Sequence, residues 1–562
     1  MDTQRLILFM LFTFSVFFLM DAWQKDKQPQ PVPSQAAVPG QAAAPRAASG
    51  PAAIPVPVPT RPLTAAAPAA PAAPPAAASG ALQKGETVRV ETDVFIADID
   101  TAGGDLRFLE LLTHRDTLDH KKNFVLLQQQ GEHTYVVQSG LIGNDLPNHR
   151  TRYTTGEREV RLAAGADRVS VRLSAPQAGG VKVTKIYNFH RGSYAIDVGY
   201  EIENTSAAAI QPDAYFQIVR DSTPPAGDSA MLPTYTGIAV YTDKEKFQKV
   251  DFADIAKGKI SYPKKSDDGW IALLQHYFLS AWLPANNTPR EFYTRRLDNG
   301  LNAAGVIVPV GTIAPGARSA LTVPLYAGPQ EQDKLSQLAP GLELTIDYGW
   351  LTVIAKPLFW FLQWLHQWVG NWGVAIIVLT VIIKALFYPL SAASYRSMAR
   401  MSILAPRMQK LKEQYGDDRQ RMNQAMMEMY KTEKINPLGG CLPIVVQIPV
   451  FIALYWVLLA SVELRHAPFI WWIDDLSAAD PYFVLPLLMG ATMIFQTYLN
   501  PVPPDPVQAK VMKIMPVAFS IFFFFFPAGL VLYWLINNIL SIAQQWYIKR
   551  AMEHAKLAHG KK

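Results

Sequence analysis

One lysine lies inside an otherwise apolar run, and it is the strongest chemical signal in this chain. Lys384 belongs to NWGVAIIVLTVIIKALFYPL (371–390). A charge at the centre of a membrane span costs about 2.5–3.5 kcal/mol on insertion scales, so it usually faces a water-filled cavity or reaches for the nearer membrane surface. Both interpretations apply, because Pro389 follows five residues later, roughly 7 Å along a helix, within reach of a lysine stem. Further polar groups in neighbouring spans would favour the cavity.

Four such polar residues accompany Lys384 in the apolar C-terminal third: Thr380, Gln447, Asn537 and Asn538. Each is costly if it faces lipid, although Gln447 or Asn538 alone serves equally well as a hydrogen bond between helices. Together with a cation, these side chains favour a polar groove among the spans. Such a groove could hold the hydrophilic part of an incoming protein partway across the membrane and so shorten the apolar barrier.

The elements that must position these residues are apolar segments as long as membrane spans. After 371–390 they cover 442–462, 483–499, 511–526 and 530–548. A further apolar run, 6–20, follows Arg5. We interpret it as a short signal-anchor, because Met20 and Ala22 would have to be the small residues before a cleavage site and Met20 is not small. The sequence therefore predicts six spans.

Charge in the loops predicts the orientation of these spans. Basic residues collect in 391–435 and in the C-terminal tail: Arg396, Arg400, Arg407, Lys410, Lys412, Arg419, Arg421, Lys431, Lys434, Lys549, Arg550, Lys556, Lys561 and Lys562. Because basic loops stay in the cytoplasm, both segments and both termini are expected there. Loop 463–480 has one basic residue, Arg465, and is expected outside. Segment 391–435 reads as a helical hairpin, with an aspartate of its turn at 416–418 capping the second helix.

The exported part begins with a linker and continues as a β domain. Residues 29–80 are almost entirely Pro, Ala, Gly, Ser, Val and Gln, a composition that forms no core and favours an extended tether. From about 81 to 326 the pattern changes to short alternating strands, which predict a large all-β sandwich. The helix expected at 356–370 is rich in tryptophan and suits the membrane interface. Its expected apolar face holds Leu358, Phe361, Leu362, Leu365 and Val369.

Composition and missing motifs exclude several kinds of chemistry. A hydrophobic fraction of 50% with 13 tryptophans over 562 residues indicates a membrane chain with more than one body. The single cysteine, Cys441, excludes an intramolecular disulfide and disfavours a thiolate metal site. The sequence has no HExxH, GxSxG or nucleotide-binding GxxxxGK[ST] motif. We expect no catalytic residue, no metal ion, no cofactor and no DNA partner.

Three longer motifs resemble the YidC family of membrane protein insertases: NPLGGCLPIVVQIPVFIALYWVL (436–458), FPAGLVLYWLINN (526–538) and DYGWL (347–351). Segment 185–204 is similar to that family's periplasmic domain, a β-supersandwich like those of sugar mutarotases. The resemblance implies a polytopic α-helical protein of the bacterial inner membrane, with a five-helix insertase core and a large all-β periplasmic sandwich. The implied parts are an anchor (1–23), a linker (24–80), the β domain (81–340), an interface helix region (341–371), the core (372–548, with hairpin 391–435) and a basic tail (549–562).

The resemblance also implies a mechanism. The family's core forms a hydrophilic groove that opens to the cytoplasm and to lipid but is closed toward the periplasm. Lys384 and Thr380 match groove positions, and Tyr533 and Trp534 match an aromatic pair of the last span. Many members have Arg where this chain has Lys384, so the positive charge is kept, while the planar guanidinium group that can bind a carboxylate through two hydrogen bonds is lost. Trp534 stands where some members have a second Tyr.

The function implied is insertion and folding of nascent inner-membrane proteins, alone or beside the Sec translocon. Membrane lipids are further partners, and the basic hairpin and tail allow contact with a ribosome. Two other functions compete. A secondary transporter using Lys384 as substrate or proton site predicts paired repeats, which the spans lack. A membrane-anchored sugar-modifying enzyme predicts that deletion of 81–326 abolishes activity, whereas an insertase core could survive that deletion.

Overall fold

The computed structural model describes residues 84–131, 133–227, 234–259, 261–415, 418–433, 442–499 and 506–559. The predicted anchor at 6–20 and the predicted tether at 29–80 lie outside these residues. The described chain forms two compact units, a β unit that ends at Thr345 and a helical unit that begins at Ile346. The sequence therefore predicted the change from strands to helices correctly.

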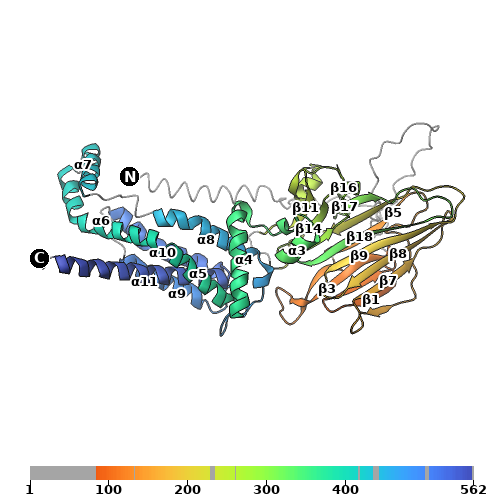
Figure 1. The fold of residues 1–562 in the computed structure, drawn as a ribbon, viewed down its shortest axis with the longest axis horizontal. Helices are drawn as coiled ribbons and strands as arrows, with labels where there is room; N and C mark the ends of the chain where they lie inside the picture. The colour runs from red at the N-terminus through yellow and green to blue at the C-terminus, as the bar shows by residue number, and fades with distance from the viewer. Residues whose placement is uncertain are drawn as a thin grey trace, which may run out of the picture. The chain divides into compact units, whose positions relative to one another are not determined.

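The β unit is a sandwich of two sheets (Figure 1). In spatial order, the larger sheet contains β13 (Lys265–Ser266), β16 (Arg290–Arg296), β17 (Asn302–Pro309), β10 (Asp213–Arg220), β5 (His133–Ile142), β4 (Asn123–Gln130), β3 (Asp105–Arg115), β2 (Phe95–Asp100), β1 (Thr87–Glu91) and β6 (Glu159–Arg161). The smaller sheet contains β12 (Lys246–Val250), β11 (Gly237–Thr242), β14 (Trp270–Leu274), β15 (Phe278–Trp282), β18 (Arg318–Pro329), β9 (Ala195–Asn204), β8 (Val181–His190) and β7 (Arg168–Ser174). The strands pair antiparallel, except that β1 and β6 are parallel.

Alternation along the strands produces the core of the sandwich. In β8, every second residue from Val181 to Phe189 is buried, as expected when successive side chains point to opposite faces of a sheet. Large rings fill the space between the sheets, and the centroids of Phe216 and Trp282 are 4.9 Å apart. Three short helices complete the unit: α2 (Phe252–Ala256), α3 (Gln332–Leu338) and η1 (Leu342–Thr345).

A buried cation lies inside this sandwich. Lys185 of β8 is fully buried, and its Nζ donates to the carbonyl oxygens of Gly103 at 3.2 Å and Ser139 at 3.3 Å. Three tyrosine rings lie 5.5–5.9 Å from the same atom: Tyr153, Tyr187 and Tyr200. Burial lowers the pKa of Lys185 to about 8, although the negative charge of Asp105 opposes that shift. The β unit thus carries an ionisable group whose charge is costly in the folded state.

The helical unit is built from eight α-helices in the described residues: α4 (Thr352–Val369), α5 (Trp372–Leu386), α6 (Tyr388–Tyr415), α7 (Arg419–Thr432), α8 (Leu442–Ala460), α9 (Val484–Leu499), α10 (Pro506–Phe522) and α11 (Ala528–His559). Short 3-10 turns add η2 (Gly349–Leu351), η4 (Val462–Leu464) and η5 (Phe523–Phe525). Helix α11 packs against α5, α6 and α9, while α8 packs against α4 and α6 (Figure 1).

By length and hydropathy, no single described helix qualifies as a membrane span, whereas one bent pair does. The pair joins Trp372–Leu386 to Tyr388–Ser397 at 61°. Pro389 is the second residue of α6 and lacks the N–H that would extend the hydrogen-bond ladder of α5. Three apolar helices are shorter: Val446–Ala460, Val484–Leu499 and Lys513–Phe525. Six spans therefore stay a prediction.

Two local predictions have different outcomes. In the hairpin, the Asp418 side chain accepts hydrogen bonds from the backbone N–H groups of Gln420 and Arg421 and caps α7, as the sequence predicted. The apolar face predicted for α4 stays a prediction, because it concerns the membrane interface. Within the helical unit, Leu362 and Leu365 are buried together with Ala355 and Phe359, and Val369 is exposed. The helix starts at Thr352 and packs against both α5 and α8, which turns its buried side.

Candidate functional site

Lys384 lies in the last turn of α5 and is 6% exposed. Its Nζ donates a hydrogen bond to Ser541 Oγ of α11 at 2.7 Å. Among the described residues, no carboxylate forms an ion pair with it. The carbonyl end of a helix favours a cation, but a buried charge without a counter-charge remains costly. The surroundings of Lys384 must therefore be polar.

A set of hydrogen bonds leads from Lys384 across the unit and passes through both the backbone carbonyl and the side chain of Asn537. Ser541 Oγ, which accepts from Lys384, donates to the Asn537 carbonyl oxygen at 2.7 Å. Asn537 Oδ1 in turn accepts from Gln447 Nε2 of α8 at 2.6 Å. These bonds connect α5, α11 and α8 through four residues, which we term the polar chain: Lys384, Ser541, Asn537 and Gln447. Three of these four residues are those that the sequence singled out.

Thr380 and Asn538 have other partners. Thr380 is buried, and its hydroxyl donates to the Ile376 carbonyl oxygen of its own helix at 2.6 Å, a bond typical of Thr in helices. Asn538 Nδ2 donates to Thr492 Oγ1 at 2.9 Å and connects α11 to α9. Asn538 therefore serves as a bond between helices, one of the two roles that the sequence left open.

Tyr533 and Trp534 belong to an aromatic cluster. The Trp534 ring stacks on Phe451 of α8 with centroids 4.9 Å apart, and Tyr533 is fully buried. The rings of Phe523 and Phe526 meet Trp534 edge-on. Among the described residues, Trp534 Nε1 has no hydrogen-bond partner. This cluster fixes α11 against α8 by packing, next to the turn of α11 that carries Asn537.

Sequence reasoning missed two residues on α11. Ser541 is the direct partner of Lys384, and Gln544 Nε2 donates to the Lys384 carbonyl oxygen at 3.4 Å. The available signal was spacing, because residues 537, 541 and 544 recur every three or four positions and share one helix face. Serine and glutamine are also common on solvated helix surfaces, so this spacing indicates a site only once α5 is known to pack against that face.

At the other end of these helices, the loop between α8 and α9 (residues 461–483) is hydrogen-bonded to the starts of α5 and α11, and we term it the tied loop. Asn371 Nδ2, just before α5, donates to the Phe469 carbonyl oxygen at 2.9 Å. The first N–H groups of α11 donate to the same loop, Ala528 to Ala478 at 2.7 Å and Gly529 to Leu476 at 2.9 Å. Gly373, which lies against Phe469 of this loop, and Lys384 are eleven positions apart in α5, roughly 17 Å along the helix. The loop and Lys384 therefore occupy opposite ends of α5.

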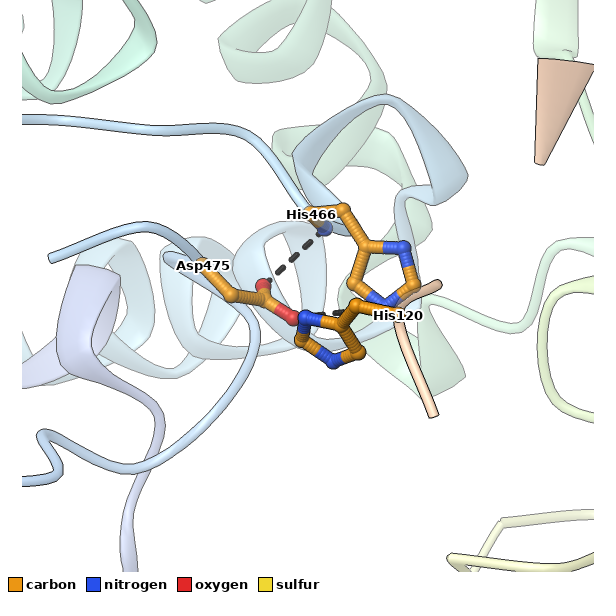
Figure 2. A group of neighbouring side chains, drawn as sticks. All are labelled: His120, His466 and Asp475. Carbon is orange, nitrogen blue, oxygen red and sulfur yellow. Dashed lines mark hydrogen bonds and ion pairs between the residues drawn. The ribbon is translucent and has the colours of Figure 1, made fainter. Parts of the chain in front are cut away.

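Two aspartates organise this loop. Figure 2 shows the Asp475 carboxylate beside His466: it accepts from the His466 backbone N–H at 3.0 Å, and its second oxygen lies 3.6 Å from the His466 ring Nε2. Asp480 is 1% exposed and accepts from Trp472 Nε1 at 3.0 Å and from the N–H of Leu485 at 2.7 Å. These buried bonds make the loop an ordered part of the helical unit.

The chain resembles known proteins over nearly its whole length. The model of the YidC periplasmic domain matches residues 87–361, and that of the 60Kd inner membrane protein matches 364–556. A membrane protein insertase YidC from Nitrosospira multiformis is 57% identical, over 98% of both chains. One from Methylobacillus flagellatus is 58% identical, over 99% of this chain and 98% of its own. A crystal structure of an active YidC insertase with its first transmembrane domain resolved has 18% identity and a TM-score of 0.37, and covers 83% of this chain and 95% of its own.

Proposed function

The chain belongs to the YidC family of membrane protein insertases, and from that premise we propose that its polar chain receives the hydrophilic part of a client. It is an inner-membrane insertase that acts on nascent membrane proteins. The proposal concerns the place where a client is held. The polar chain forms the floor of that place, and the aromatic cluster around Trp534 borders it.

The observation that carries this proposal is the partner of Lys384. The buried ammonium lies against the Ser541 hydroxyl at 2.7 Å, and no described carboxylate pairs with it. A cation kept in this state attracts an acidic or strongly polar group from outside the protein. A client with an acidic extramembrane segment would supply the missing counter-charge while its apolar segment moves into lipid. Hydrophobic transfer and the membrane potential would drive the step.

The topology that we propose places Lys384 on the cytoplasmic side of the tied loop. Six spans with both termini in the cytoplasm agree with the basic hairpin and tail and with the single basic residue of loop 463–480. The parts would then be the anchor, the linker, the β domain at 81–340, the interface helix region at 341–371 and the core at 372–548. In this arrangement the groove opens to the cytoplasm, while the tied loop covers its periplasmic end.

The basic hairpin is our proposed contact for the ribosome, and the Sec translocon a proposed partner of the core. Part of the hairpin charge is paired internally, since Arg407 bonds to Glu433 at 2.6 Å and Arg421 lies 3.3 Å from Asp418. Lys410 and Lys431 are exposed, and neither forms an ion pair within the described part of the hairpin. Ribosome binding through such residues would weaken steeply with salt, which cosedimentation at two salt concentrations would measure.

The test of the proposed site is client insertion in proteoliposomes, read by protease protection of a single-span client. Empty liposomes and the variants Lys384→Arg, Lys384→Ala and Lys384→Glu accompany the wild type. We expect Arg to retain insertion and Glu to lose it. Equal insertion by all variants would contradict a role for the charge, because Lys384 would then only reach for the membrane surface. Failure of the well-folded wild type would contradict insertion by this chain alone.

A further inference from the structure

Large apolar side chains are exposed together on the loop between η4 and α9. The exposed fractions are 46% for Ile470, 79% for Trp471, 68% for Tyr482 and 42% for Phe483. We term these four residues the anchor surface. Single exposed hydrophobic residues are common, but neighbouring ones in one ordered loop indicate a binding surface.

The backbone is held in an unfavourable conformation at two of the four positions. Trp471 has a φ of 54° and Phe483 a φ of 57°, a left-handed region that large side chains rarely adopt. His466 is the only other non-glycine residue with positive φ in the described helical unit, and it lies in the same loop. Such conformations persist where the surrounding structure enforces them, often at functional sites. Here they occur at exposed aromatic residues.

One buried carboxylate supports both halves of the anchor surface. Asp480 Oδ1 accepts from Trp472 Nε1 and from the Tyr482 backbone N–H, both at 3.0 Å. The Trp472 ring stacks against Trp471 with centroids 5.6 Å apart. The Phe483 N–H donates to the Asp480 carbonyl oxygen at 3.1 Å. The surface is therefore preorganised by bonds within the loop.

The chemistry of the loop identifies its partner. Residues 466–483 contain no Lys or Arg, and among them Asp474 is an exposed acid, so attraction to anionic partners is absent. Tryptophan and tyrosine with apolar neighbours are the residues of membrane–water interfaces. The surface also continues into α9, whose Leu487 and Leu488 are 61% and 48% exposed. A lipid bilayer fits all three features.

We propose that the anchor surface binds the headgroup region of the outer leaflet and fixes the depth of the helical unit in the membrane. The proposal rests on the membrane topology given under Proposed function. Because aromatic and apolar groups make the contact, its depth should be the same in zwitterionic and anionic vesicles. An anchor at this end would hold the opposite end, with Lys384, at a constant distance from the cytoplasmic surface.

The test is depth measurement with spin labels on the full-length chain in proteoliposomes. Native Cys441 is replaced by Ser, and single cysteines are introduced as Trp471→Cys and Tyr482→Cys. Tyr482→Cys is the second site because substitution at the strained position 471 can disturb the loop. Leu487→Cys serves as the hydrocarbon reference. Gly156→Cys, where an added Cβ meets no atom within 4 Å, serves as the aqueous reference.

We expect the labels at 471 and 482 to lie between the two references, about 5–10 Å into the headgroup–acyl boundary, with the same oxygen and nickel-chelate accessibility in both vesicle types. If the labels at 471 and 482 were as accessible to the nickel chelate as the label at 156, the proposed membrane contact of the anchor surface would be overturned. Labels shielded from both reagents would also overturn it, since they indicate a protein partner. An aqueous label at 487 would instead overturn the membrane placement on which the proposal rests.

Discussion

Replacement of Lys384 by methionine should reduce insertion of acidic clients far more than insertion of neutral ones. Methionine replaces the charged lysine by an unbranched apolar side chain that is one atom shorter, and Ser541 retains its bond to the Asn537 carbonyl oxygen. Two unit charges at 4 Å attract by about 1 kcal/mol in water and about 4 kcal/mol at the effective dielectric of a protein surface. With about 1.4 kcal/mol per factor of ten, the loss of initial rate should lie between about fivefold and several hundredfold.

The assay compares two single-span clients that differ only in an acidic or amidated tail segment. Lys513→Met, which removes an exposed lysine from α10, is the matched control and should insert both clients normally. The melting temperature of Lys384→Met in detergent should equal or exceed that of the wild type, because an unpaired buried charge is removed. Equal losses for both clients would refute our reasoning, since the lysine would then act on the fold rather than on client charge.

Three further predictions concern the fold. Gln447→Leu and Asn537→Leu should each destabilise the helical unit by about 1–3 kcal/mol, because each change leaves one polar group unpaired. The double variant should lose less stability than the sum of the two single losses. Thermal unfolding in detergent measures these losses, and additive losses would contradict the hydrogen bond between Gln447 and Asn537. Gly373→Ala should lower the melting temperature, since an added Cβ would lie 2.0 Å from the Phe469 ring, and Phe469→Ala should restore it; no recovery would argue against that contact. The β unit should gain stability as pH rises from about 8 toward 10.5, because Lys185 binds a proton more weakly when folded than when unfolded; urea unfolding of Lys185→Met should show no such gain.

Several local features followed from the sequence because their causes are local. The Asp418 cap depends on one side chain and the N–H groups two and three residues later. Strand alternation in β8 depends on a period of two. Lys384, Gln447 and Asn537 were found because polar residues are costly in apolar segments wherever the helices lie. Their roles in client binding stay proposals.

Other features could not be predicted because they arise where distant segments meet. Ser541 becomes the partner of Lys384 only when α11 packs against α5, 157 residues away in the chain. The buried side of α4 depends on two neighbouring helices, so helix periodicity alone did not show that Ala355 and Phe359 are buried. Alternation in β8 places Lys185 on the buried face with Val183 and Tyr187, but only the sandwich supplies the carbonyl oxygens that accept from its Nζ.

The sequence by itself determined the family, the β domain that precedes the helical unit, and the apolar segments that carry polar residues, because composition, motifs and periodicity are properties of the chain. Tertiary structure decided which polar groups meet. It joined Lys384, Ser541, Asn537 and Gln447 into one hydrogen-bonded chain, assigned Asn538 to α9, and tied the loop of Asp480 to the first turns of α5, α9 and α11. Hydrogen bonds require atoms within about 3 Å, and only the packing of helices brings residues so far apart in sequence to that distance.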